Sequence, residues 1–290
     1  MGAMTPLEVV TQATFNPVPT VAILVTLGWY LWSVRRLARK GREWPLARTV
    51  SFFAAEFLMA VALISGMGAH DGIFEVHTIQ HIFIGMLAPI FFALSAPVTL
   101  ALQASGRRVQ TAILKVLHSP VGRIASNPIF TWSFYGVSIF GLYFTSLYGV
   151  TLRNQTVHDL VHLHLIVAGC LFWWPAVAVD PLPRRMSYGV RIAYLMLALP
   201  FHTILGMALD SQTTRITPTT TLPDLHAGGG LMWVAGEALG LIGTLAVFVQ
   251  WLRADERAAR RNDRTSEDVA ALQVAHWRAT REAAARAVSN

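Results

Sequence analysis

The sequence predicts an all-α membrane protein, a polytopic bundle of about seven transmembrane helices with its N-terminus outside and its C-terminus in the cytoplasm. Of its 290 residues, 54% are hydrophobic and 13% are charged, whereas soluble domains carry about 25% charged residues. Seven stretches each supply the roughly 20 mostly apolar residues that a helix needs to cross a bilayer. The basic residues fall in alternate connections between these stretches. This composition excludes an ordinary soluble domain and a disordered chain.

Charges, proline or glycine separate the predicted spans along the chain. The spans cover residues 17–34, 49–69, 77–103, 128–150, 157–179, 192–210 and 228–252. No basic segment precedes the first span and no small-residue cleavage site follows it, so we expect a retained span rather than a signal peptide. The spans define a membrane domain, residues 1–252. A charged cytoplasmic C-terminal helix or tail, residues 253–290, is expected to follow it.

Lysine and arginine decide the orientation, because cytoplasmic connections retain them. All of the 23 basic residues except Arg153 and Arg215 fall in the first, third and fifth connections or after the last span. These segments are therefore cytoplasmic, and the N-terminus is outside. The net charge of +7 follows from this bias, so we expect membrane lipid and no nucleic acid among the partners. In the third connection, residues 106–127 combine apolar and basic positions in the pattern of an interfacial amphipathic helix.

Eight of the ten histidines fall on the predicted outer side, and four of them form two pairs with the same spacing. His77 and His81 begin the third span, and His158 and His162 begin the fifth. Residues i and i+4 of a helix lie about 6 Å apart on one face, so both imidazoles of a pair can reach one metal ion. Histidine does not direct membrane insertion, so the asymmetry has a chemical cause. The pattern predicts a metal site.

Further imidazoles and thioethers on the outer side extend the set of candidate ligands. One histidine lies inside the sixth span, where an unpaired polar group is costly and usually functional. Two methionines end spans on the outer side, and thioethers together with imidazoles favour Cu(I) over harder ions. The predicted metal ligands are His77, His81, His158, His162, His164, His202, His226, Met67 and Met207.

Carboxylates occur both near this cluster and within the spans. Outer residues such as Asp159 and Asp224 are expected to bind the metal, to support its ligands or to attract cations. Glu56 and Glu237 lie inside the second and seventh spans. Each of these two needs a partner, a raised pKa or a cavity.

The same histidines admit other interpretations. Two facing helices can hold a haem between two histidines, although a four-residue separation leaves room for one haem at most. Di-iron membrane oxygenases also use HxxxH spacing, but their histidines lie on the cytoplasmic side and usually include adjacent pairs. A transporter or a structural subunit could line an aqueous vestibule with histidines.

Enzymatic catalysis has no support in the sequence. The chain contains no GxSxG, Walker A, HExxH or CxxC motif. The lone Cys170 excludes a disulfide framework and a cysteine-rich zinc site. We therefore expect that the protein is not an enzyme.

Several segments resemble, in their order, the motifs of one known family. They are His77-Thr78-Ile79-Gln80-His81, Ala88-Pro89, Ser95-Ala96-Pro97-Val98-Thr99-Leu100, residues 154–162, Leu171-Phe172-Trp173-Trp174-Pro175, Asp180-Pro181-Leu182-Pro183-Arg184-Arg185, Pro200-Phe201-His202 with Gly206, and Ala227-Gly228-Gly229 with Met232-Trp233 and Gly236-Glu237. Over about residues 70–240 the chain resembles the CtaG-type cytochrome c oxidase assembly factors.

The resemblance implies a seven-span protein that helps to build a haem-copper oxidase by handling copper for its active site. It carries over His77, His81, His158 and His202 as candidate ligands, while His162 and His164 compete for the second place in their motif.

Two stretches depart from the family pattern. Leu142-Tyr143-Phe144-Thr145 stands where the family often has Trp-His-x-Pro, and Asp224-Leu225-His226 stands where it often has Asp-Gln. A ligand could be lost at the first place and gained at the second.

We therefore expect a cytochrome c oxidase assembly factor, multi-pass in a bacterial plasma membrane. It would bind copper as Cu(I) at an outward-facing His/Met cluster and deliver it to the oxidase. The expected partners are the catalytic subunit of cytochrome c oxidase or other assembly factors. The alternative is a non-catalytic accessory subunit of a respiratory complex whose histidines are structural. The third hypothesis is a membrane b-type haem protein.

Overall fold

The computed structural model of the chain describes residues 16–70, 72–217 and 220–288. Within these residues every regular element is a helix, which confirms the predicted all-α fold class. In chain order the elements are α2 (Pro17–Arg39), α3 (Leu46–Ile64), η1 (Gly66–Ala69), α4 (Phe74–Ile82), η2 (Phe83–Leu87), α5 (Ala88–Ser95), α6 (Pro97–Ala104), α7 (Arg107–Leu117), α8 (Pro120–Ala125), α9 (Pro128–Tyr143), α10 (Leu147–Thr151), α11 (Gln155–Val177), α12 (Tyr188–Met196), α13 (Leu199–Asp210) and α14 (Leu222–Val288).

Six helical stretches of the described residues are long and apolar enough to cross a membrane, as expected of a multi-pass membrane protein. They are Pro17–Arg39, Leu46–Ile64, Phe74–Ala104, Gln155–Val177, Tyr188–Asp210 and Leu222–Asp263. The remaining predicted span, 128–150, is divided between α9 and α10. Helix α9 has 16 residues and measures about 24 Å, less than the roughly 30 Å of a hydrocarbon core. The count of seven crossings and the orientation of the termini stay predictions.

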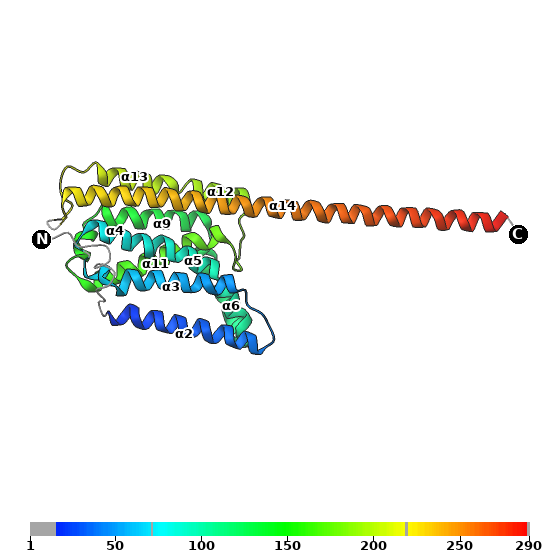
Figure 1. Ribbon diagram of the computed structural model, residues 1–290, viewed down its shortest axis with the longest axis horizontal. Coiled ribbons are helices and arrows are strands. Elements are labelled where there is room, and N and C mark those ends of the chain that lie inside the picture. The colour runs from blue at the N-terminus through cyan, green and yellow to red at the C-terminus, as the bar shows by residue number, and fades with distance from the viewer. Residues whose placement is uncertain (1–15, 71, 218–219, 289–290) are drawn as a thin grey trace. The chain divides into compact units, whose positions relative to one another are not determined.

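Helix α5 lies among the other membrane helices, as Figure 1 shows. Helices α3 and α11 both pack against α5, α9 packs against α11, and α2 packs against α3. The ring of Tyr30 on α2 stacks on Phe52 of α3 at 3.8 Å between centroids. Leu37 and Leu100 join this small core, which holds α2 against α3 and α6.

The chain from Phe74 to Ala104 is helical but not one regular α-helix. The segment η2 is a π-helix in which the N–H of Ala88 donates to the carbonyl of Phe83, five residues earlier. Farther along, Ala96 has a φ of 52° in the left-handed region. Pro97 then starts α6 in a new direction. Four short helices therefore share the length of this span.

A buried carboxylate fixes the break before α6. Oδ1 of Asp180 accepts hydrogen bonds from the backbone N–H of Thr99 at 2.7 Å and from its hydroxyl at 2.6 Å, and Oδ2 accepts from the N–H of Val98 at 3.2 Å. These amides belong to the first turn of α6, where backbone donors lack intrahelical partners. Burial raises the pKa of Asp180, and the three hydrogen bonds oppose that shift. Two of the motif segments therefore meet at a helix cap.

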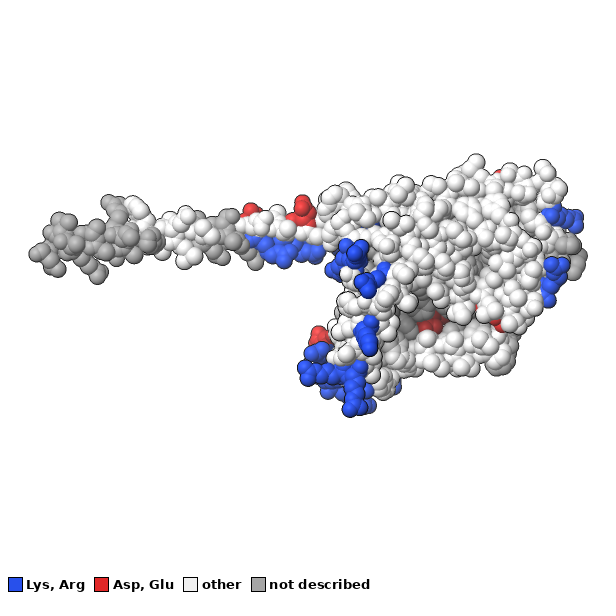
Figure 2. Space-filling view, turned by 180° about the vertical axis from the view of Figure 1, so that it is seen from behind, with Lys and Arg blue, Asp and Glu red and all other residues white. Residues whose placement is uncertain are grey.

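Basic side chains in the first compact unit of the chain, Met1–Thr244, lie at the helix ends. On the face drawn in Figure 2, one group lies where α2 ends and α3 begins, and a smaller group lies at the opposite end. The surface between them is almost free of basic side chains on this face. This distribution suits helices that cross a bilayer.

The second compact unit is Leu245–Asn290, so the division falls inside α14 rather than at the predicted boundary of 252 and 253. Helix α14 is continuous across both positions. Helices α7 and α8 occupy the stretch predicted to be amphipathic, residues 106–127, and neither has a buried residue.

Candidate metal centre

Four histidines from two helices lie ring against ring inside the bundle. His77 and His81 belong to α4, and His158 and His162 belong to α11. Within each pair the ring centroids are 3.9 Å and 4.2 Å apart, and across the helices His77 faces His158 at 5.6 Å and His81 faces His162 at 5.4 Å. We call these four residues the four-histidine centre. The i, i+4 spacing brings the imidazoles together within each helix, and the packing of the two helices brings the two pairs together.

The nitrogen atoms of three of these residues are close enough to share one ion after small side-chain movements. His77, His81 and His158 each offer a ring nitrogen, and these atoms lie within 4.8 Å of one another. Two nitrogens bound to one ion at about 2.1 Å are at most about 4.2 Å apart. Small rotations of the imidazoles would therefore bring all three into a first coordination shell.

The centre is buried, and several of its ring nitrogens have no hydrogen-bond partner among the described residues. His77 is 0% exposed. Among the described residues, no hydrogen-bond partner meets either ring nitrogen of His77, Nε2 of His81 or Nε2 of His162. Leaving a buried polar group unsatisfied costs about 1–3 kcal/mol, and few such groups occur in folded proteins. The donor set fits a metal ion that imidazoles prefer, such as copper or zinc.

A tyrosine on α9 orients one of the ligands. Nδ1 of His81 and Oη of Tyr143 share a hydrogen bond of 3.0 Å. When Nδ1–H donates this bond, Nε2 carries the lone pair and is available for a metal. Such outer partners fix the tautomer and ring orientation of metal-binding histidines. Tyr143 lies in the stretch where the resemblance led us to expect the loss of a ligand.

Aromatic side chains cover one side of the centre. Phe74 contacts Tyr143 and Tyr148 edge to face at 5.7 Å and 5.4 Å between centroids. Tyr148 also packs its ring against His77 at 4.9 Å. All three aromatic rings are buried. They exclude water, which strengthens electrostatic interactions inside the site.

Two features of the fold hold α4 and α11 in place. Asp224, at the start of α14, accepts hydrogen bonds from the backbone N–H of Phe74 at 2.6 Å and of Glu75 at 2.9 Å, and so caps α4 one turn before its histidines. Gly169 of α11 packs directly on the carbonyl of Gly85 in η2, where any side chain would collide. Close contact through small residues is typical of membrane helices.

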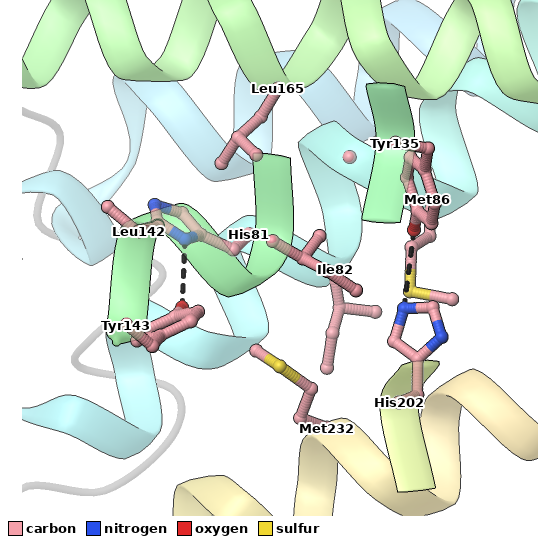
Figure 3. Close-up of a pocket in the computed structure, with 11 residues that line it drawn as sticks. His81, Ile82, Met86, Tyr135, Leu142, Tyr143, Leu165, His202 and Met232 are labelled. Carbon is pink, nitrogen blue, oxygen red and sulfur yellow. Dashed lines mark hydrogen bonds between the residues drawn. The ribbon is translucent and has the colours of Figure 1, made fainter. Parts of the chain in front are cut away.

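The sixth predicted span places His202 at a separate cavity, shown in Figure 3. This cavity has a volume of about 30 Å³ and is lined by His81, His202, Met86 and Met232, among others. Its volume suits an occupant of the size of a water molecule. Oη of Tyr135 and Nε2 of His202 share a hydrogen bond of 3.3 Å. His81 therefore belongs both to the four-histidine centre and to the wall of this cavity.

The other predicted ligands lie apart from the centre. Nε2 of His164 hydrogen-bonds to the hydroxyl of Ser138 at 2.8 Å. Nε2–H of His226 donates to the carbonyl of Gln212 at 3.0 Å. Met207 is 55% exposed on α13, and Met67 is buried in η1. Their assignment as metal ligands stays a prediction without support from their positions.

The two carboxylates inside the predicted spans have different surroundings. Glu237 accepts a hydrogen bond from the hydroxyl of Thr203 on the neighbouring span. Glu56 is buried on α3, and within the described residues its Oε1 has no hydrogen-bond partner. Neither lines the cavity beside His202.

Sequence reasoning missed the tyrosines and one of the methionines. Tyr135 and Tyr143 come from α9, which carries no histidine in its apolar sequence and so gave no signal. Met86 lies five residues after His81, and only the π-helical turn of η2 explains its place beside the cavity. In the sequence, the spacing of the paired histidines was the one strong signal of the site.

The comparisons with known proteins assign the chain to a family. The family described as cytochrome c oxidase caa3 assembly factor (Caa3_CtaG) matches residues 28–254. The chain belongs to this family. The expected resemblance to CtaG-type assembly factors is thereby confirmed, and all four histidines of the centre lie inside the matched region.

The similar curated proteins are bacterial and uncharacterized. One from Mycobacterium leprae is 30% identical over 265 residues, which cover 85% of this chain and 40% of the relative. Another from Mycobacterium bovis is 30% identical over 279 residues, which cover 90% of this chain and 42% of the relative. The chain thus spans about two fifths of the length of these relatives. No solved structure matches the chain.

Proposed function

We propose that this protein binds Cu(I) at the four-histidine centre and passes the ion to a haem-copper oxidase during its assembly. The observation that carries the proposal is the convergence of four buried imidazoles, of which those of His77, His81 and His162 have ring nitrogens without a hydrogen-bond partner among the described residues, in a member of an oxidase assembly family. A haem-copper oxidase needs copper at its active site, and imidazole is a good copper ligand. The thioethers of Met86 and Met232 near His81 add a preference for the Cu(I) state.

In this proposal the protein is a carrier and not an enzyme. It acts as a multi-pass protein of a bacterial plasma membrane, with the centre toward the outer side. The receiving partner is the catalytic subunit of cytochrome c oxidase or another assembly factor. Because the imidazoles are neutral ligands, the bound ion retains its charge and can leave by ligand exchange when a partner offers competing donors.

Within this centre His77, His81 and His158 would supply the first ligands, and His162 would supply the fourth or exchange with them. Bound copper would be the cargo of the protein, and it would undergo no reaction at this site. Tyr143 holds the ring of His81, and the rings of Phe74 and Tyr148 exclude water. Each residue therefore has a role in binding, orientation or shielding.

The test is the copper content and optical spectrum of the detergent-purified full chain after reconstitution with Cu(I). Wild type should hold near-stoichiometric copper without a Soret band, and His77→Ala/His81→Ala should lose it. The matched control is His70→Ala/His118→Ala, which also removes two histidines but leaves the centre intact. Copper should remain bound to the control.

Two outcomes would contradict the proposal. A Soret band would assign the histidines to haem. Equal and negligible copper in wild type and both variants would favour an accessory subunit with structural histidines. In that case His77→Ala/His81→Ala should also support normal oxidase assembly in cells.

A further inference from the structure

A groove opens on the side of the bundle between α2, α3, α4 and α11. Its volume is about 630 Å³. Figure 2 shows the surface hollowed next to α2, with acidic atoms visible inside the hollow. We call it the lateral groove, and the lining residues used below are Gln80, Gln155, Asp159, His162 and Leu163.

The lateral groove reaches the four-histidine centre through one residue. Among the described residues that line it, His162 is the one member of the centre. His162 is 7% exposed, and its Nε2 has no hydrogen-bond partner among the described residues. On another side the rings of Phe74, Tyr143 and Tyr148 cover the centre. An ion that arrives from the groove would therefore meet His162 first.

Polar groups line the groove on the way to His162. Asp159 lies one turn before His162 on α11, and its Oδ1 accepts a hydrogen bond from Nε2 of Gln155 at 2.9 Å. Gln80 is 1% exposed and donates through Nε2 to the carbonyl of Ala62 at 2.9 Å. Its Oε1 has no partner among the described residues. A carboxylate and an unused amide oxygen thus precede the imidazole, and both attract a cation.

Asp159 gives the groove its charge. Among the described residues that line the groove, it is the one that is an aspartate, glutamate, lysine or arginine. The other lining side chains are largely apolar, and low-dielectric walls concentrate the field of a carboxylate. The groove is therefore negative where a cation would enter it.

We propose that the lateral groove is the loading route for the metal ion, with Asp159 as the attracting group and His162 as the first ligand. This inference rests on the proposed function, because it assumes that the four-histidine centre binds Cu(I). Asp159 holds the cation near the mouth, and Nε2 of His162 then replaces one weakly bound ligand of the incoming ion. One metal–ligand bond forms as another breaks, and no electron or proton is transferred. The ion then moves to His158, His81 and His77.

The test compares loading rates with final copper content in the full-length protein. The probe is Cu(I) in a coloured complex with a weak chelator, so that transfer is followed optically. In Leu163→Trp a large ring should fill the groove, since Leu163 is 57% exposed and lines it. Its matched control is Ile204→Trp, at a position that is 55% exposed on α13 and outside the groove.

Leu163→Trp should slow loading at least about tenfold while the final copper content stays equal to that of wild type, and Ile204→Trp should load normally. Asp159→Asn keeps the hydrogen-bond acceptor but removes the charge, and it should slow loading by about tenfold at low salt. That difference should shrink at high salt, because salt screens the charge of a carboxylate that is only partly buried.

Several results would overturn the route, and they differ from failure of the proposed function. Wild-type loading rates in both Leu163→Trp and Asp159→Asn would show that the ion enters elsewhere. The groove would then be a site for a lipid chain. If Leu163→Trp loaded copper at the wild-type initial rate but reached a lower final copper content, the substitution would have changed the affinity and not the route of entry. Absence of Cu(I) binding by wild type would instead refute the proposed function, and this inference with it.

Discussion

At the scale of single residues, the hydrogen bond between Tyr143 and His81 decides how one imidazole faces the metal. The bond of 3.0 Å is made inside the protein, where both side chains are buried. Tyr143→Phe removes the hydroxyl and keeps the ring that packs on Phe74. We expect the affinity for Cu(I) to fall about 10- to 100-fold, as for other outer partners of metal-binding histidines.

A competition titration with a Cu(I) chelator measures this effect. The control is Tyr188→Phe on α12, where the ring itself packs under the guanidinium of Arg191. It should bind Cu(I) as wild type does. Unchanged affinity in Tyr143→Phe would show that the hydrogen bond does not orient His81.

The sequence predicted the four central histidines because helical spacing is a local property. His77 with His81, and His158 with His162, lie on shared faces whatever the rest of the fold is. The hydrogen bond of His164 to Ser138 and the role of Tyr143 depend on which helix lies opposite. A single sequence does not show which helices pack against each other. These residues were therefore identified only from the structure.

At the scale of the helices, the contact between α11 and η2 sets the distance between the two histidine pairs. Gly169→Ala would force a methyl group onto the carbonyl of Gly85 and onto Pro89. Overpacking of this kind costs about 1–3 kcal/mol. We expect a lower thermal unfolding midpoint and weaker Cu(I) binding, because α11 must move away from α4.

Thermal unfolding in detergent and a copper titration check this prediction together. Gly141→Ala on α9 is the control, since the new methyl group would meet no atom within 4 Å. It should leave both properties unchanged or raise the stability slightly. Equal behaviour of the two variants would mean that the helices separate without strain.

The cap on α6 gives a second prediction for a helix. Asp180→Ala leaves two backbone amides and the hydroxyl of Thr99 without their acceptor. Loss of a helix cap costs about 0.5–2 kcal/mol. Asp180→Asn retains one carbonyl oxygen and should recover part of that loss. Thermal unfolding of the three proteins should therefore rank wild type above Asp180→Asn and Asp180→Ala last, and any other order would contradict the cap.

The positions of the helices could be predicted because most apolar stretches are long. The interruptions within those helices could not be predicted. The predicted third span, 77–103, begins close to α4 and ends close to the end of α6. Its π-helical turn and its left-handed residue, Ala96, depend on packing against α11 and on Asp180. These are contacts between distant segments, which periodicity alone does not reveal.

At the scale of the whole molecule, the basic residues predict which side of the membrane each connection faces. If residues 128–150 cross the bilayer, Arg123 and Arg153 face opposite sides. We expect a membrane-impermeant maleimide to label Arg153→Cys in intact cells, and Arg123→Cys only after the membrane is permeabilised. Both positions are exposed. Each labelling variant should also carry Cys170→Ser, which removes the native thiol.

Labelling of both cysteines from the same side would show that α9 does not cross, and that the chain has an even number of spans. Arg215→Cys is a useful third position, because it shares the predicted side of Arg153 without lying next to α9. Two candidate spans separate Arg215 from Arg153, so Arg215→Cys should be labelled from the same side as Arg153→Cys whatever the path of α9 is.

The π-helical turn η2 has one more consequence, for the way in which this span can change during evolution. A π-turn contains one residue more than the α-helical turn that it replaces. Each residue of an α-helix advances the side chains by about 100°. Deleting one residue within Phe83–Leu87 would therefore rotate His77 and His81 relative to Pro89 and the rest of α5. The extra residue lets the part of the span before η2 turn its histidines toward α11, while the part after η2 keeps the face that packs on α3.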